Sequence, residues 1–181
     1  MNHTTRSIQQ LVLTAACLAL CLVLPFLTAQ VPEIGNMLCP MHIPVLLCGF
    51  ICGPVWAAVM GGVAPVLRFS LFGMPPLFPV GVAMCFELAA YGAVSGLLYR
   101  RLPRKPSSIY IALLTAMLAG RILWGVVRVL LAGATNATFT WAAFFAGAFT
   151  SAVPGIILHT LLIPLIVLAL ERALPWLKIR S

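Results

Sequence analysis

Acidic residues are almost absent from this sequence. Its 181 residues contain no aspartate and three glutamates, Glu33, Glu87 and Glu171. An enzyme that uses paired carboxylates for acid–base chemistry therefore has little to build on. The sequence also lacks the ATP-binding pattern G-x-x-x-x-G-K-[ST], the nucleophile pattern G-x-S-x-G and the zinc pattern H-E-x-x-H. The chain thus carries no recognised motif for binding ATP or for hydrolysing a substrate.

Charged residues of either sign are scarce. Only 8% of the residues are charged, whereas 62% are hydrophobic. A soluble domain needs more polar surface than this to cover its core. A membrane-spanning helix takes roughly 20 apolar residues, so about six helices and short loops use the whole length. We therefore predict an all-α integral membrane bundle of six transmembrane helices, forming a single domain over residues 1–181.

Apolar runs and helix breakers predict where these helices lie. Glycine- and proline-rich or polar stretches at 30–40, 71–79 and 133–140 are predicted loops. Gly61, Gly62 and Pro65 interrupt the third apolar run, so we expect it and the short second run to cross obliquely or to break inside the bundle. The predicted segments are about Ile8–Thr28, Met41–Cys52, Val55–Phe69, Val80–Tyr99, Ile109–Leu131 and Ala142–Ala173.

The distribution of Lys and Arg predicts the orientation in the membrane. The formal net charge is +8. If the segments alternate across the bilayer, the basic residues near the segment ends fall on one side, and the opposite loops contain no Lys or Arg. Cytoplasmic loops collect these residues. We therefore predict cytoplasmic N- and C-termini in a bacterial cytoplasmic membrane. The residues concerned are Arg6, Arg100, Arg101, Arg104, Lys105, Arg172, Lys178 and Arg180.

The six cysteines do not predict a metal or redox centre. Five of them lie inside apolar runs, where cysteine behaves as a small hydrophobic residue, and only Cys39 falls in a predicted external loop. The two C-x-x-x-C pairs, at 17–21 and 48–52, have no His or acidic residue at zinc spacing. No metal and no cofactor is predicted.

Six ionisable residues lie inside the apolar segments, where charge is unfavourable and therefore suggests function. They are His42, Arg68, Glu87, Arg121, Arg128 and His159. We predict that Glu87 and Arg121, both near mid-membrane, form a structural ion pair. His42, placed near the outer face, either contacts a ligand or caps an irregular helix start. His159 is expected to pack and to bond a neighbouring carbonyl, with ligand contact as the alternative.

Arg121, Trp124 and Arg128 recur at three- and four-residue spacing and so share one helix face. Two guanidinium groups around an indole suit a ligand with a carboxylate or phosphate and an apolar body. Alternatively, Arg128 extends outward along the helix to reach the interface. Aromatic residues near the outer side, Trp141 among them, form an interfacial belt or line part of a pocket.

Three stretches resemble a known family, the substrate-binding S components of energy-coupling factor (ECF) vitamin transporters. Ala15 and Ala19 form A-x-x-x-A in the first helix, residues 41–62 read MHIPVLLCGFICGPVWAAVMGG, and residues 147–167 read GAFTSAVPGIILHTLLIPLIV. The resemblance implies a pocket near the outer surface, gated by external loops, that binds a vitamin with high affinity. It also implies docking through Ala15 and Ala19 to a transmembrane scaffold subunit with two ATPases, so that the chain itself is not an enzyme.

The start of the second apolar run, Met41-His42-Ile43-Pro44-Val45, most resembles the pantothenate-specific branch of this family. The resemblance suggests that Arg128 or Arg68 pairs with the pantothenate carboxylate, while Asn36, His42 and Trp124 contact its body. A riboflavin-specific member is the alternative, because the aromatic outer wall with Trp141 suits a flavin.

Two other classes of function stay open on the residues alone. A standalone small-solute transporter would move its substrate without partner chains. An intramembrane enzyme would have only His42, Glu87 and His159 as acid–base groups.

Overall fold

A computed structural model describes residues 3–28, 38–103, 105–134 and 153–173 of the chain. Within these ranges there are six α-helices and no strand, so the predicted all-α fold is confirmed. Five helical segments are long and apolar enough to cross a membrane. The elements are α1 (His3–Val23), the 3-10 turn η1 (Leu24–Thr28), α3 (His42–Ile51), α4 (Pro54–Phe72), the turn η2 (Leu77–Gly81), α5 (Val82–Arg101), α6 (Pro106–Ala134) and α8 (Val153–Ala173).

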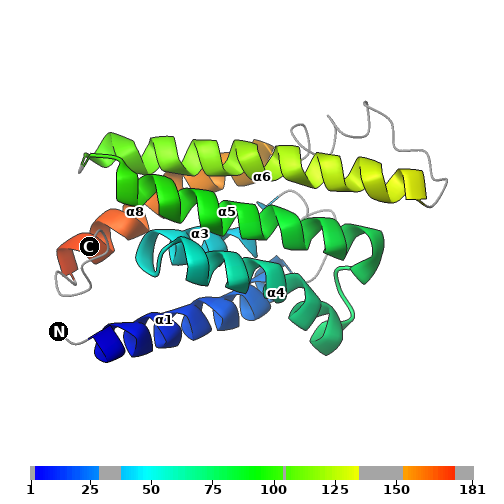
Figure 1. Ribbon diagram of the computed structural model, residues 1–181, viewed down its shortest axis with the longest axis horizontal. Helices are drawn as coiled ribbons and strands as arrows, with labels where there is room; N and C mark the ends of the chain where they lie inside the picture. Colours follow the sequence, from blue (N-terminus) through cyan, green and yellow to red (C-terminus); the bar gives the residue numbers. More distant parts are fainter. Residues whose placement is uncertain (1–2, 29–37, 104, 135–152, 174–181) are drawn as a thin grey trace.

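The short helix α3 lies inside the bundle. Its 10 residues are too few to cross a bilayer, which takes roughly 20. Every residue from His42 to Phe50 is buried, and α3 packs against α1, α4, α5 and α8 (Figure 1). Neighbouring helices therefore shield its ends from lipid, which is the condition for ending a helix at membrane depth. The prediction of a short, protein-shielded second segment is confirmed.

Of the two alternatives predicted for the third segment, an oblique crossing or a break, the break is wrong, because α4 continues through Gly61, Gly62 and Pro65. It begins at Pro54, directly after Gly53, whose φ of 97° ends α3, and it stops at Gly73, whose φ is 71°. Proline in the first turn and a left-handed glycine after the last turn are common helix boundaries. The two glycines therefore do not break α4, and Gly61 permits close packing against α5.

Helix α5 approaches α3 and α4 very closely at small residues. A Cβ atom added to Gly61 of α4 would lie 2.5 Å from the backbone oxygen of Leu88. On α5, a Cβ at Gly92 would lie 2.6 Å from the backbone of Ala57, and one at Gly96 would lie 2.6 Å from the nitrogen of Pro54. Small residues at four-residue spacing permit such close contact between membrane helices. This contact fixes the position of α5, which carries the residues at the centre of the site.

The start of α1, the junction of α5 with α6 and the end of α8 lie at one end of the bundle (Figure 1). Gln10 of α1 and Arg100 of α5 both donate to the backbone oxygen of Cys52, at 3.2 and 3.1 Å. Tyr99 of α5 donates to Glu171 of α8. Hydrogen bonds thus connect α1, α3, α5 and α8 at this end, which we call the basic end because Arg100, Arg101, Lys105 and Arg172 all lie there.

The other helix boundaries agree with the predictions to within a few residues. Helix α6 is three residues longer at each end than the predicted 109–131. Helix α8 ends at Ala173, where the last segment was predicted to end, while residues 142–152 of that segment lie outside the described residues. The second predicted loop is shorter than 71–79, because α4 runs to Phe72 and η2 begins at Leu77.

Candidate functional site

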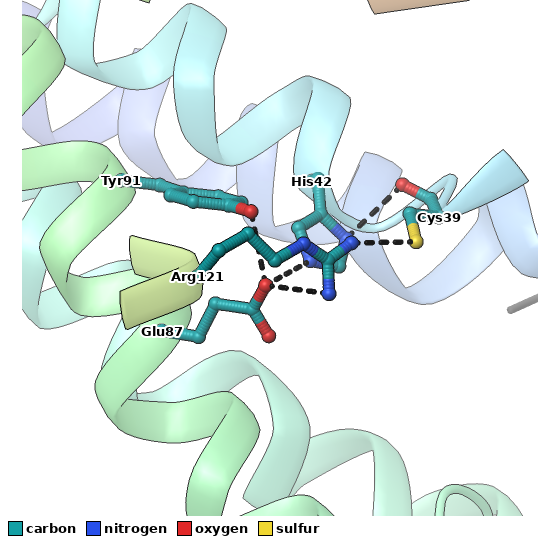
Figure 2. A network of polar contacts seen from close by, with 5 residues as sticks. All are labelled: Cys39, His42, Glu87, Tyr91 and Arg121. Carbon is teal, nitrogen blue, oxygen red and sulfur yellow. Dashed lines mark hydrogen bonds and ion pairs between the residues drawn. The ribbon is translucent and has the colours of Figure 1, made fainter. Parts of the chain in front are cut away.

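A cluster of polar side chains lies in the interior of the bundle, and Glu87 of α5 is its centre. The Glu87 side chain is 1% exposed. Helix α3 contributes His42, α6 contributes Arg121, and Tyr91 comes from α5 itself, while Cys39 precedes α3 (Figure 2). Because charged groups are unfavourable inside a membrane, such a cluster points to a functional role for these residues.

Three groups converge on one oxygen of the Glu87 carboxylate. Arg121 Nη1 lies 3.0 Å from Oε1, the Tyr91 hydroxyl donates to the same atom at 2.9 Å, and His42 Nε2 lies 3.5 Å from it. The other oxygen, Oε2, points away from these partners (Figure 2). The structure therefore places the predicted pair Glu87–Arg121 in contact and adds the Tyr91 hydroxyl and the His42 ring on the same oxygen.

Local sequence features explain why these side chains meet. Tyr91 follows Glu87 by four residues, so both lie on one face of α5. Gly120 of α6 faces the ring of Tyr91, and a Cβ atom at this position would overlap the ring. The glycine thus lets α6 approach α5 closely enough for Arg121, the next residue, to reach Glu87.

His42 stands at the start of α3, on the side of Glu87 that Arg121 and Tyr91 also face. Its side chain is buried, with 3% exposure, because α3 begins in the interior of the bundle. The ring donates through Nδ1 to the backbone oxygen of Cys39 at 3.1 Å. Cys39 also accepts a contact from Arg121 Nη2 at 3.5 Å through its sulfur. Cys39, which was predicted to lie in an external loop, therefore contacts two members of the cluster, His42 and Arg121.

His159 of α8 extends the cluster on the other side of His42. The two imidazole rings are stacked, with centroids 6.1 Å apart and an angle of 25° between their planes. His159 is 2% exposed, and neither of its ring nitrogens has a hydrogen-bond partner of good geometry among the described residues, although the backbone of Cys39 lies near it. The expected bond to a carbonyl is therefore at most weak in this structure.

Arg68 of α4 lies apart from this cluster. It is 4% exposed, and its Nη1 donates to the backbone oxygen of Leu22, in the last turn of α1, at 2.6 Å. The guanidinium also sits 5.4 Å from the ring centres of both Phe26 and Phe72. A cation at the end of a helix satisfies its carbonyls and its dipole. Arg68 of α4 therefore connects this helix to the end of α1.

Trp124 and Arg128 continue the face of α6 that begins with Arg121. The guanidinium carbon of Arg128 lies 5.8 Å from the ring centre of Trp124, a distance typical of a cation–π contact. Both side chains are half-buried. The face predicted from the spacing therefore has two parts, because Arg121 turns to Glu87 while Arg128 lies against the indole, further from the basic end.

Two predicted contact residues, Asn36 and Trp141, lie outside the described residues. Ala15 and Ala19 are exposed on α1, whereas Cys17 and Cys21 of the same helix point into the bundle. The described residues include no group of three His, Cys, Asp or Glu side chains arranged to hold a metal ion.

Sequence reasoning missed Tyr91, and for His159 it favoured packing, with ligand contact as the alternative. The signal for Tyr91 was present, since it stands one helical turn from Glu87, the only carboxylate far from the ends of a predicted segment. As a whole, the site offers hydrogen-bond donors and acceptors around an internally paired charge, an arrangement suited to holding a polar molecule in an apolar bundle.

Comparison with protein families gave a match over most of the chain. The sequence model described as "ECF transporter, substrate-specific component" matches residues 9–167, from within α1 to within α8. Comparisons with curated proteins and with solved structures gave no match. The matched range contains the whole polar cluster and the exposed alanines of α1.

Proposed function

The chain belongs to the family of substrate-specific components of ECF transporters, and on this premise we propose that it is the high-affinity vitamin-binding subunit of an ATP-driven importer, with pantothenate as its substrate. The observation that supports a binding role most directly is the buried polar cluster around Glu87 in an otherwise apolar bundle. Ligand sites combine apolar walls with a few placed polar groups.

Arg128 is the better of the two predicted partners for the pantothenate carboxylate. Arg68 already donates to Leu22 and lies between two phenylalanine rings, so a ligand would have to displace these contacts. Arg128 lies on the same face of α6 as the polar cluster, against Trp124. We therefore assign the carboxylate to Arg128, the apolar body to Trp124, and a positioning role to Arg68. Asn36 and Trp141 remain predicted contacts.

The exposed face of α1 supports a docking role. Ala15 and Ala19 are one turn apart and both exposed, so that face of α1 is uncovered in the isolated chain. Small side chains allow two membrane helices to approach closely. We assign this face to contact with the transmembrane scaffold subunit, which would carry the two ATPases. The basic end of the bundle is assigned to the cytoplasmic side.

Ligand-dependent stability tests the substrate. The purified chain in detergent is heated with and without pantothenate, and the small molecules that co-purify are identified by mass spectrometry. A ligand at about 1,000 times its Kd adds roughly 4 kcal/mol to the free energy of unfolding, so the melting temperature should rise clearly. A yellow preparation stabilised by riboflavin would instead assign the riboflavin branch, and uptake into liposomes by this chain alone would contradict a role as a subunit.

A bulky residue on α1 tests docking. Ala15→Trp should abolish uptake by the assembled transporter and leave pantothenate binding by the isolated chain unchanged. Leu161→Trp, at a strongly exposed position on α8, is the matched control and should leave both unchanged. Loss of binding in Ala15→Trp would show that this face belongs to the binding fold rather than to docking.

A further inference from the structure

Several buried polar atoms of the cluster have no hydrogen-bond partner of good geometry among the described residues. They are both ring nitrogens of His159 and Nε of Arg121, and the carboxylate of Glu87 lies beside that guanidinium, with Oε2 pointing away from the partners of Oε1 (Figure 2). The side chains that carry them adjoin one another, since His159 stacks on His42 and His42 and Arg121 both contact Glu87. The spare donors and acceptors therefore belong to one place in the bundle.

Such atoms require a partner, because a buried polar group without a hydrogen bond destabilises a protein. A neutral imidazole has one donor and one acceptor, the guanidinium has only donors, and the carboxylate has only acceptors. The set thus combines both kinds of group. A molecule that satisfies it must itself donate and accept, as a hydroxyl or an amide does.

Charge disfavours an ionised partner at this position. Glu87 and Arg121, 3.0 Å apart, already neutralise each other. A second carboxylate would be repelled by Glu87, and an ammonium group would be repelled by Arg121, in a region with little water to screen either interaction. A neutral polar group is therefore the chemistry that the cluster accepts best.

The second cation of α6 lies at a defined distance from the cluster. Arg128 follows Arg121 by seven residues, which corresponds to about 10 Å along a helix. Trp124 lies between them and against Arg128. A ligand that spans this face would meet a neutral polar site at the cluster, an aromatic surface at Trp124 and a cation at Arg128.

We propose that the unpartnered ring nitrogens of His159 and Nε of Arg121, beside Glu87, form a deep subsite that selects for a neutral hydroxyl or amide group and so orients the ligand with its carboxylate toward Arg128. This inference rests on the proposed binding function and adds the direction of the ligand and a specificity-determining residue. Pantothenate has these features, since hydroxyl and amide groups lie at one end and a carboxylate at the other.

Three probes separate the two ends of the ligand. They are pantothenate, its analogue with the carboxylate replaced by an alcohol, and its analogue with both hydroxyls replaced by hydrogen. Dissociation constants are measured by calorimetry for the wild-type chain in detergent. The wild-type chain should prefer pantothenate to each analogue by roughly 10-fold or more.

Two variants should each lose one of these preferences, one for the hydroxyls and the other for the carboxylate. His159→Leu should bind pantothenate and the deoxy analogue within about twofold of each other, yet keep its preference for the carboxylate over the alcohol. Arg128→Met should bind pantothenate and the alcohol analogue within about twofold of each other, yet keep its preference for pantothenate over the deoxy analogue. If His159→Leu does not fold, His159→Asn, which keeps a donor and an acceptor, should retain most of the hydroxyl preference.

The outcomes separate this inference from the substrate assignment. A wild-type chain that binds none of the three probes overturns both. If the wild-type chain binds pantothenate but His159→Leu weakens all three probes equally, only the subsite is overturned, because His159 then acts by packing. Loss of the hydroxyl preference in Arg128→Met would show the opposite orientation of the ligand.

Discussion

Two glutamates of the bundle accept a hydrogen bond from a tyrosine of α5, yet they lie in very different surroundings. Tyr91 donates to Glu87 at 2.9 Å in the interior, and Tyr99 donates to Glu171 at 2.5 Å at the basic end. Glu87 is buried and has Arg121 at 3.0 Å as a counterion. Glu171 is only half-buried, in the last turn of α8 beside Arg172.

The difference shows what each region requires of a carboxylate. In the interior the charge is removed from bulk water, so the chain supplies both a cation and hydrogen-bond donors from its own helices. Removing one partner there leaves another charge buried. At the basic end, water and neighbouring cations share this task, so the tyrosine mainly connects α5 with α8. The first glutamate organises a site, whereas the second tethers two helices.

The largest expected effect comes from neutralising the interior carboxylate. Glu87→Gln should lower the free energy of unfolding by about 3–5 kcal/mol, because Arg121 is then buried without a counterion. Glu171→Gln is the matched variant and should lower it by about 1 kcal/mol. Both are measured by denaturant titration in detergent micelles. Equal losses would remove the distinction between the two regions.

A double variant shows whether this loss comes from the stranded charge. Glu87→Gln combined with Arg121→Met should be more stable than Glu87→Gln alone, because the unpaired guanidinium is gone. If adding Arg121→Met instead lowers stability further, the loss in the single variant reflects packing around Glu87 rather than charge.

The next effect concerns the interior hydroxyl. Tyr91→Phe keeps the ring, which lies against Gly120 and 5.1 Å from the ring centre of His42, and removes only the bond to Glu87. A hydrogen bond to a charged group contributes about 1.5–3 kcal/mol, so the free energy of unfolding should fall by that amount. Denaturant titration measures the loss. A change below about 0.5 kcal/mol would mean that Arg121 alone stabilises the carboxylate.

The position of Glu87 also depends on the close packing of α4 on α5. Gly61→Ala would place a Cβ atom 2.5 Å from the backbone oxygen of Leu88, the neighbour of Glu87, so α5 must shift. Such overpacking destabilises by about 1–3 kcal/mol. The adjacent Gly62→Ala meets only the Cβ of Ala89 at 4.0 Å and should be neutral within about 0.5 kcal/mol. A thermal melt of the two variants in detergent compares them directly.

Much of the fold could be predicted from the sequence because hydropathy is a property of the chain alone. The segment ends at 99–101, 106–109 and 173 follow from apolar runs that meet charged or proline residues. The pairing of Glu87 with Arg121 was also accessible, since they are the opposite charges nearest mid-membrane in consecutive segments. These inferences need no knowledge of which helix faces which.

The rest depends on neighbours that the sequence does not name. Gly61 suggests a break when α4 is considered alone, and only the close approach of α5 shows that the glycine serves packing. Arg68 suggested a ligand contact, yet a backbone oxygen at the end of α1 accepts its hydrogen bond. His42 reaches Glu87 because α3 is short and begins inside the bundle. Partners across helices decide all three cases.

The smallest expected effect tests the basic end by itself. Tyr99→Phe keeps the ring, which meets Phe50 edge to face at 4.8 Å, and removes only the hydroxyl that donates to Glu171. Hydrogen bonds between membrane helices contribute about 0.6 kcal/mol on average. The free energy of unfolding should therefore fall by about that value, which is less than the fall in Tyr91→Phe. Pantothenate affinity should not change, because this bond lies at the end of the bundle away from Arg128. A loss as large as that in Tyr91→Phe would mean that Glu171 depends on its tyrosine as strongly as Glu87 does, and the contrast between a solvated and an unsolvated carboxylate would fail.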